Sequence, residues 1–316
     1  MRALALFFAV LTSAHASAQM LNDQGPPQHR IVYRNTVGGR INPLGLLYEG
    51  RLMYRFRLFE SSSLALRDNF IGAGVALSMS PAFGNAGAYV EFQPLSVLGF
   101  WASYVYSRYF RTFGLFQSYP SASTSDFSDV ENSRRAALPR TDPLSNYVTD
   151  GSQLIIGADF QVKFWQILLR SKTRMIRADY ALREGDTVYY EQFYDVLAPN
   201  RGWYLTEDVD LLWQRSDSRV FAGARYTGTT AFYSGRQYLA GEEQTNPNSM
   251  HRVGPFAGYT FKVEDGAMFN NPTVFLLAQW WLVHRYRTGA MSTQALPLIS
   301  IGFQFTGDLL PFQKKN

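Results

Sequence analysis

The chain has 316 residues, of which 46% are hydrophobic, 16% aromatic and 17% charged, and its formal net charge is +5. Ordinary soluble domains carry roughly 25% charged residues, and so many apolar residues exclude a disordered or coiled-coil chain. The absence of cysteine excludes a disulfide scaffold and any thiolate chemistry. The mean hydropathy is -0.17, so polar residues are interspersed among the apolar ones, as in the strands of a membrane β-barrel.

The first eighteen residues are typical of a cleaved secretory signal. Arg2 supplies a basic start, residues 3–11 form a short apolar region, and Ala16-Ser17-Ala18 fits an A-x-A cleavage site. We therefore expect residues 1–18 to be a signal peptide and the mature chain to begin at Gln19. An N-terminal membrane anchor is the alternative, but it needs a longer apolar stretch.

Beyond this segment, apolar and polar residues alternate with a period of two. Tyr54 and Leu52, for example, alternate with Arg51, Met53 and Arg55. Beyond the signal, no run of about 18 apolar residues occurs, so no helix is expected to cross a membrane. A chain that spans the membrane must then cross it with strands. The pattern predicts an all-β fold, a transmembrane antiparallel up-and-down β-barrel of about twelve strands. A secreted β-sandwich or an open sheet explains the long strands with aromatic ends less well.

The connections between the predicted strands alternate in length. Short turns follow Phe92, Phe164, Gln214 and Val263, whereas residues 112–149, 181–202 and 233–250 read as long loops. The predicted strands are residues 31–37, 48–58, 71–79, 86–93, 95–111, 153–164, a strand after Trp165-Gln166 that carries Arg170, Lys172 and Arg174, and then 203–214, 220–232, 251–263, 273–287 and 295–305.

Short turns of such barrels face the periplasm and long loops face outward, so both termini are expected in the periplasm. The expected division is an N-terminal periplasmic segment at 19–29 and a barrel at 30–305 whose long extracellular loop covers 112–149. A periplasmic tail is expected at 306–316.

Two segments carry a resemblance to known proteins. The run 298–305, Leu-Ile-Ser-Ile-Gly-Phe-Gln-Phe, resembles the aromatic-rich closing strand of bacterial outer-membrane barrels, although a tail follows it in place of a terminal Phe. The run 66–77, with 80–83 and 87–95, resembles a group of uncharacterised barrel proteins of myxobacterial type. The resemblance implies a Gram-negative outer membrane, with its lipids and the barrel assembly machinery as partners. It implies no activity.

Basic side chains outnumber acidic ones on the predicted inward face, which predicts a lumen that attracts anions. The basic wall is expected at Arg51, Arg55, Arg57, Arg170, Lys172 and Arg174. The other predicted inward basic residues are Lys163, Arg219, Arg225, Arg252, Lys262, Arg285 and Arg287, against Glu49, Glu91, Asp159, Asp208 and Asp210.

Two functions fit this wall. A passive channel or binding barrel for small anions is one, because Arg binds carboxylate and phosphate with two donors. The other is a non-conducting structural barrel in which acids neutralise the wall, with loop acids such as Asp126, Asp129 or Glu131 folding inward. Strand number alone leaves both open. The basic residues form no continuous exterior patch, so no nucleic-acid partner is expected.

An enzyme is the remaining alternative. Asp208, Asp210, His251 and His284 are expected near one rim of the barrel, where an outer-membrane protease or lipid-acting hydrolase would place a site. No motif fixes their spacing, and the sequence contains no G-x-S-x-G, H-E-x-x-H or Walker A motif. We therefore assign no catalytic residue, metal ligand or cofactor, and the oligomeric state stays open.

Overall fold

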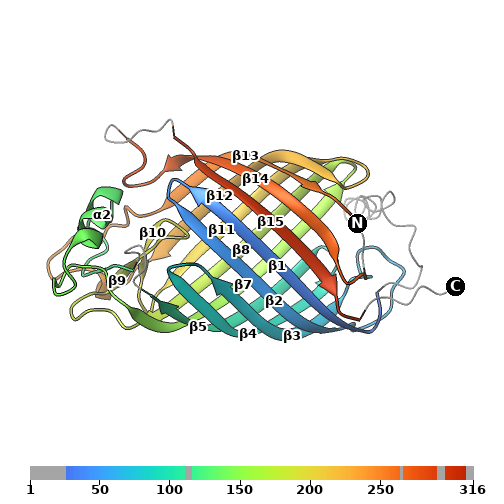
Figure 1. Ribbon diagram of the computed structural model, residues 1–316, viewed down its shortest axis with the longest axis horizontal. Coiled ribbons are helices and arrows are strands. Elements are labelled where there is room, and N and C mark those ends of the chain that lie inside the picture. Colours follow the sequence, from blue (N-terminus) through green and yellow to red (C-terminus); the bar gives the residue numbers. More distant parts are fainter. Residues whose placement is uncertain (1–25, 111–115, 264–265, 290–295, 311–316) are drawn as a thin grey trace, which may run out of the picture.

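The computed structural model describes residues 26–110, 116–263, 266–289 and 296–310, so the predicted signal peptide lies outside the described residues. Twelve antiparallel strands form a closed barrel in which β1 pairs with β15, which confirms the predicted fold (Figure 1). They are β1 His29–Ile41, β2 Gly45–Phe56, β3 Phe70–Met79, β4 Phe83–Leu95, β5 Leu98–Tyr109, β7 Thr149–Phe164, β8 Ile167–Tyr180, β11 Trp203–Gln214, β12 Val220–Phe232, β13 Met250–Thr260, β14 Asn270–Val283 and β15 Leu298–Asp308.

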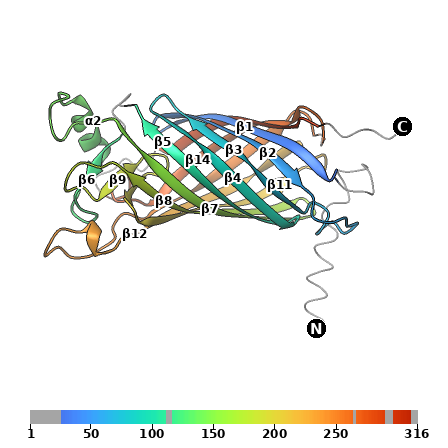
Figure 2. The same cartoon turned by 90° about the horizontal axis from the view of Figure 1, so that it is seen from below.

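The three longest connections leave the end of the barrel opposite to the described ends of the chain (Figures 1 and 2). They contain structure that the sequence interpretation missed. A three-stranded sheet is built from β6 Ser118–Tyr119, β9 Val188–Glu191 and β10 Val196–Pro199. The helix α2 covers Asp129–Ala137, and a 3-10 turn, η2, covers Gly235–Gln237. No helix among the described residues is long and apolar enough to cross a membrane.

Several strand boundaries differ from the prediction. The turn expected at Pro94 lies two residues later, because the strand continues to Leu95 through a register shift after Phe92 that accommodates a residue without an N–H. At the other end of the chain, β15 continues to Asp308, which pairs with Val32 of β1. The barrel therefore includes the first three residues of the predicted tail.

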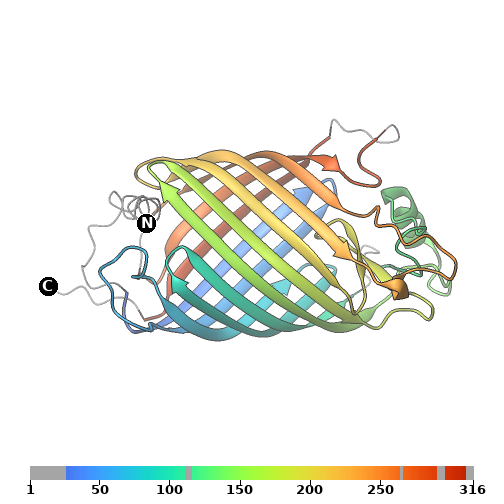
Figure 3. The same ribbon diagram turned by 180° about the vertical axis from the view of Figure 1, so that it is seen from behind.

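The alternation along each strand separates an apolar exterior from a polar interior. The strands are tilted and surround the whole lumen (Figure 3). Tyr54 and Val75 are 47% and 58% exposed, whereas Met53, one residue away from Tyr54, is 2% exposed. Exposed aromatic residues also lie toward both ends of the barrel, with Trp165 at one end and Phe232 toward the other. An exposed apolar surface of this extent is stable in lipid and costly in water, as in transmembrane β-barrels.

The two faces predict opposite tolerance to a charge. Val75→Arg places a guanidinium against lipid near the middle of β3, and it should lower the free energy of unfolding by about 2–4 kcal/mol. Thr36→Arg places the same group in the lumen, directly across from Glu49, and should cost little. Denaturant unfolding of the barrel folded into lipid vesicles measures both, and an equal loss for the two variants would contradict the assignment of the faces.

Candidate functional site

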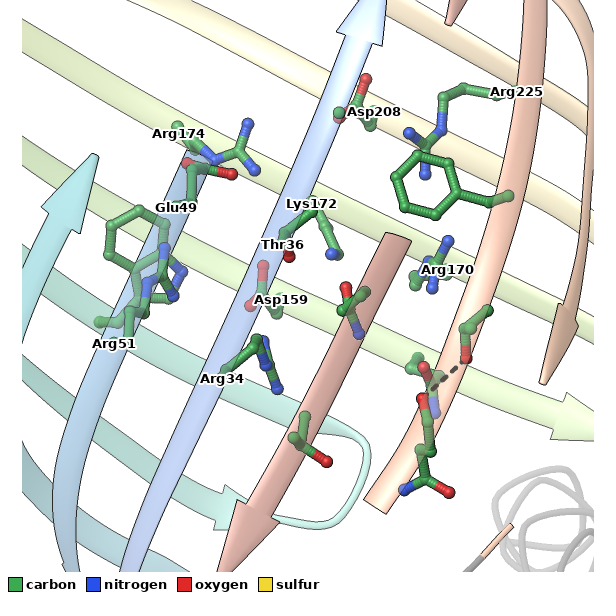
Figure 4. A pocket seen from close by; sticks show the side chains of 18 of the residues that line it. Arg34, Thr36, Glu49, Arg51, Asp159, Arg170, Lys172, Arg174, Asp208 and Arg225 are labelled. Atoms are coloured by element: carbon green, nitrogen blue, oxygen red, sulfur yellow. Dashed lines mark hydrogen bonds between the residues drawn. The ribbon is translucent and has the colours of Figure 1, made fainter. Parts of the chain in front are cut away.

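The lumen contains a cavity of about 1950 Å³, lined by residues from all twelve barrel strands (Figure 4). At the end of the barrel near the termini it is lined by Pro26, Trp165 and Ser216. Toward the opposite end it is lined by Leu44 and Ser80, which belong to two short turns. The inward side chains therefore do not fill the barrel.

The charge on this cavity is strongly one-sided. Among the described residues, thirteen basic side chains line it against four acidic ones, Glu49, Asp68, Asp159 and Asp208. The basic lining residues are Arg30, Arg34, Arg40, Arg51, Arg55, Arg57, Arg67, Lys163, Arg170, Lys172, Arg174, Arg225 and Arg252.

All six residues of the predicted basic wall thus lie along the cavity. Sequence reasoning missed Arg30, Arg34 and Arg40, which all lie on the inward face of β1, and Arg67 of the β2–β3 connection. Arg30, Arg34 and Arg40 are separated by even numbers of residues, so they share one face of a strand. This pattern was the available signal, but no inward face had been assigned to the opening strand. The reverse error affects Arg219, Lys262, Arg285 and Arg287, which were predicted to face inward and are not among the residues that line the cavity.

Some of the basic residues are neutralised locally. Asp210, 1% exposed, lies between Arg170 and Arg225 on the two adjacent strands and accepts hydrogen bonds from both, at 2.7 Å from Arg170 Nε and 2.6 Å from Arg225 Nε. Arg55 pairs with Glu91 at 3.0 Å. Such buried pairs are structural, since removing one partner leaves an uncompensated charge.

Other basic residues have no acidic partner within ion-pair distance. Among the described residues, no carboxylate lies within 4.0 Å of Lys172 or Arg174. The cross-strand neighbours of Arg174 are Gly157 and Thr206, so its own strands offer it no acid. Lys172 has Asp159 and Asp208 as cross-strand neighbours, yet it forms no ion pair with either.

Two of the loop acids that the structural alternative would fold inward, Asp129 and Glu131, do not neutralise the basic wall. Asp129 accepts hydrogen bonds from Arg287 at 2.7 and 2.9 Å, and Glu131 accepts them from Arg134 and Arg135. Both acids belong to α2, outside the barrel end (Figure 1). Their partners are therefore other loop residues.

A hairpin, residues 188–199, folds into the mouth of the barrel, and we call it the mouth hairpin. Its inward packing buries Tyr189 and Val196 against the inner wall, together with Tyr180 and Tyr204 of β8 and β11. At its tip, the backbone carbonyls of residues 192 and 193 accept hydrogen bonds from Arg40 of β1, at 2.6 and 2.8 Å. The hairpin therefore crosses the lumen from one wall to the other and narrows it.

A buried cluster holds the mouth hairpin in place. Asp195, 1% exposed, accepts hydrogen bonds from Arg287 Nε at 2.6 Å and from the Tyr190 hydroxyl at 2.7 Å, and His284 Nε2 lies 3.4 Å from its carboxylate. Burial would raise the pKa of Asp195, but the hydrogen bonds from His284 and Arg287 and the charge of Arg287 outweigh it and hold the pKa well below its usual range.

His284 is a structural residue in this cluster. Its Nδ1 accepts hydrogen bonds from the backbone nitrogens of residues 286 and 287, at 3.0 and 3.1 Å. The ring proton is therefore on Nε2, facing Asp195, and Nδ1 has no free lone pair to act as a base.

The predicted rim site is not assembled. Asp208 and Asp210 lie inside the lumen, because β11 begins at the rim with Trp203 and runs inward from there. His251 is on the outer face, with its Nδ1 2.6 Å from the Tyr226 hydroxyl. Among the described residues, no group of three or more acidic or histidine side chains is placed to hold a metal ion.

No protein-family model and no curated protein matches the chain. Solved structures similar to it include OccAB1 of Acinetobacter baumannii, with a TM-score of 0.38 and 7% identity over 95% of this chain and 99% of that one. The translocator domain of the autotransporter NalP of Neisseria meningitidis matches with a TM-score of 0.37 and 8% identity, over 89% and 88% of the two chains. The outer membrane protein OprD of Pseudomonas aeruginosa matches with 0.27 and 8%, over 95% and 96%.

These similarities, with TM-scores below 0.5, support no conclusion about activity or substrate. The resemblance to the myxobacterial-type group stays a prediction. The class of protein follows from the chain itself. A closed antiparallel barrel with an apolar exterior and a polar lumen is the fold of outer-membrane β-barrel proteins.

The mouth hairpin predicts a pH-dependent effect at Glu191, which is 5% exposed and accepts the Phe193 N–H at 3.1 Å. Burial raises the pKa of Glu191 to about 7, although the Phe193 N–H and the charge of Arg40 act in the opposite direction. The folded chain therefore binds this proton more tightly than the unfolded chain, and its stability falls as the pH rises from about 4.5 to 7.

Glu191→Gln removes this titration. The gain in melting temperature of the variant over the wild type should grow from pH 5 through pH 7 and level off by about pH 8, in detergent-solubilised protein. Glu184→Gln, at an exposed position of the same loop, is the control. A difference that does not change with pH would contradict the assignment.

Proposed function

We propose that this protein is an outer-membrane β-barrel whose Arg-rich lumen conducts or binds small anionic solutes. One observation carries the proposal: a cavity of about 1950 Å³ is lined by thirteen basic and four acidic side chains, and Lys172 and Arg174 have no carboxylate partner among the described residues. A cleft of one charge sign between low-dielectric walls concentrates ions of the opposite sign. Guanidinium groups add specific binding of carboxylate or phosphate.

The orientation belongs to the same proposal. The described ends of the chain lie at one end of the barrel, and the three longest connections, 110–148, 181–202 and 233–249, lie at the other (Figure 1). Periplasmic turns of such barrels are the shorter ones, which supports periplasmic termini and an extracellular mouth hairpin. Lipids of the outer membrane and the barrel assembly machinery are the partners that such a barrel requires.

The mouth hairpin limits what passes. Gln192, Phe193 and Tyr194 line the cavity from its tip. The cavity also extends to Leu44 and Ser80, in the short turns beside that tip. We propose that small solutes pass between the tip and these turns, whereas large ones are excluded.

The central test removes the two unpaired charges. At about 8 Å in a water-like dielectric each charge is worth ~0.5 kcal/mol to a passing ion, so Lys172→Gln with Arg174→Gln should lower the ratio of anion to cation permeability by about fivefold or more. The reversal potential of single barrels in a planar bilayer, under a salt gradient, measures this ratio.

Arg108→Gln with Arg177→Gln is the matched control, because it removes two charges from exposed positions on the outer face of β5 and β8. This control should leave the ratio unchanged. A conducting barrel whose selectivity does not respond to the luminal pair would contradict the anion wall. A wild-type barrel that never conducts would favour the structural alternative.

A further inference from the structure

The geometry points to one specific oxyanion subsite in the middle of the lumen, formed by Arg34 of β1 and Arg51 of β2. We infer that these two side chains together bind a single carboxylate or phosphate group of the solute. This inference rests on the proposed anion channel, and it names the chemical group that the channel recognises.

The first observation is a pair of like charges in register. Arg34 lies directly opposite Arg51 on the neighbouring strand, as Arg30 lies opposite Arg55. Like charges directly opposite each other are destabilising unless something compensates them. In the second pair, Asp308 lies 2.6 Å from Arg30 and Glu91 lies 3.0 Å from Arg55. In the first pair, no carboxylate among the described residues lies within 4.0 Å of either guanidinium.

The second observation is that Arg51 is held rigidly. Its guanidinium carbon lies 4.5 Å from the ring centre of Tyr89 and 5.0 Å from that of Trp101, and its Nη1 donates to the Tyr89 hydroxyl at 3.1 Å. The two rings are stacked on each other at 5.6 Å and are almost fully buried. Gly157, opposite Trp101, leaves room for the indole, since a Cβ there would lie 2.2 Å from it. A fixed planar donor group loses little entropy when it binds an anion.

The third observation is an unused donor. Arg34 Nε is buried and has no hydrogen-bond acceptor among the described residues. A buried donor without an acceptor is unfavourable, and an oxyanion supplies the acceptor.

The surroundings favour an anion as well. β1 and β8 are six strands apart in the ring of twelve, so they face each other across the lumen. Figure 4 shows Lys172 and Arg174 of β8 in the same region as Arg34 and Arg51, together with the acids Glu49 and Asp159. Asp208, directly across from Lys172, is a third acid in this region, so four basic groups against three acidic ones leave an excess of one positive charge, which a singly charged oxyanion neutralises. Planar guanidinium groups match carboxylate and phosphate oxygens, which favours these anions over chloride.

Equilibrium binding tests the subsite without requiring conduction. Inorganic phosphate and acetate are titrated calorimetrically, in a chloride background, into the full chain refolded in detergent, with heat-modifiable gel migration as the check of folding. Arg34→Gln and Arg51→Gln should each weaken binding by about tenfold or more. Arg51→Lys should weaken it similarly, because an ammonium keeps the charge but loses the planar pair of donors.

Lys163→Gln is the matched control, since it removes one luminal charge on β7 away from the proposed subsite. If all variants weaken binding equally, or if neither phosphate nor acetate binds more tightly than chloride, the subsite is overturned. Wild-type affinity in Arg51→Lys overturns it too. Preference for phosphate alone or acetate alone identifies the anion class and supports the subsite.

The same preparations separate this inference from the channel proposal. Anion-selective conductance without site-specific binding removes the subsite and leaves the channel. Binding that depends on Arg34 and Arg51 in a barrel that never conducts supports the subsite and removes the channel.

Discussion

Closure of the sheet between β1 and β15 is the constraint on which the other features depend. A lipid environment offers no water to an unpaired strand edge, so a spanning sheet must pair its first strand with its last. The pairing runs from Val32 with Asp308 to Ile41 with Ile299. Once the ring is closed, each strand presents one face to lipid and one to the lumen, so all inward charges of twelve strands share one confined space.

The lumen resolves this crowding in two ways. Asp210, between Arg170 and Arg225, and Glu91, beside Arg55, neutralise part of the wall through contacts between strands. Arg34, Arg51, Lys172 and Arg174 receive no such partner from the part of the chain that the structure describes, and a cavity remains beside them. A structural role and a solute-binding role are therefore carried by different residues of one wall. The mouth hairpin adds a third element, because it narrows the lumen through backbone contacts with Arg40 and leaves the wall charges unpaired.

Local alternation was enough to predict the barrel, the outward position of Tyr54 and the inward position of the six wall residues, because a closed sheet obeys a period of two. The features that depend on distant contacts were not predictable. The mouth hairpin consists of short apolar runs inside a loop, and the position of its tip depends on Arg40, which is far away in sequence. Asp210 was placed at the rim because the depth of a residue depends on where its strand begins.

The central claim is that the lumen is open to solutes and electrically positive. The chain has no cysteine, so Thr36→Cys places a single thiol in the cavity, and Val75→Cys places one against lipid. Anionic and cationic methanethiosulfonate reagents of similar size report access and potential together. The account predicts that the thiol at position 36 reacts about tenfold faster with the anionic reagent, relative to a free thiol, and that the thiol at position 75 is protected. An unreactive thiol at position 36, or one that prefers the cationic reagent, would contradict it.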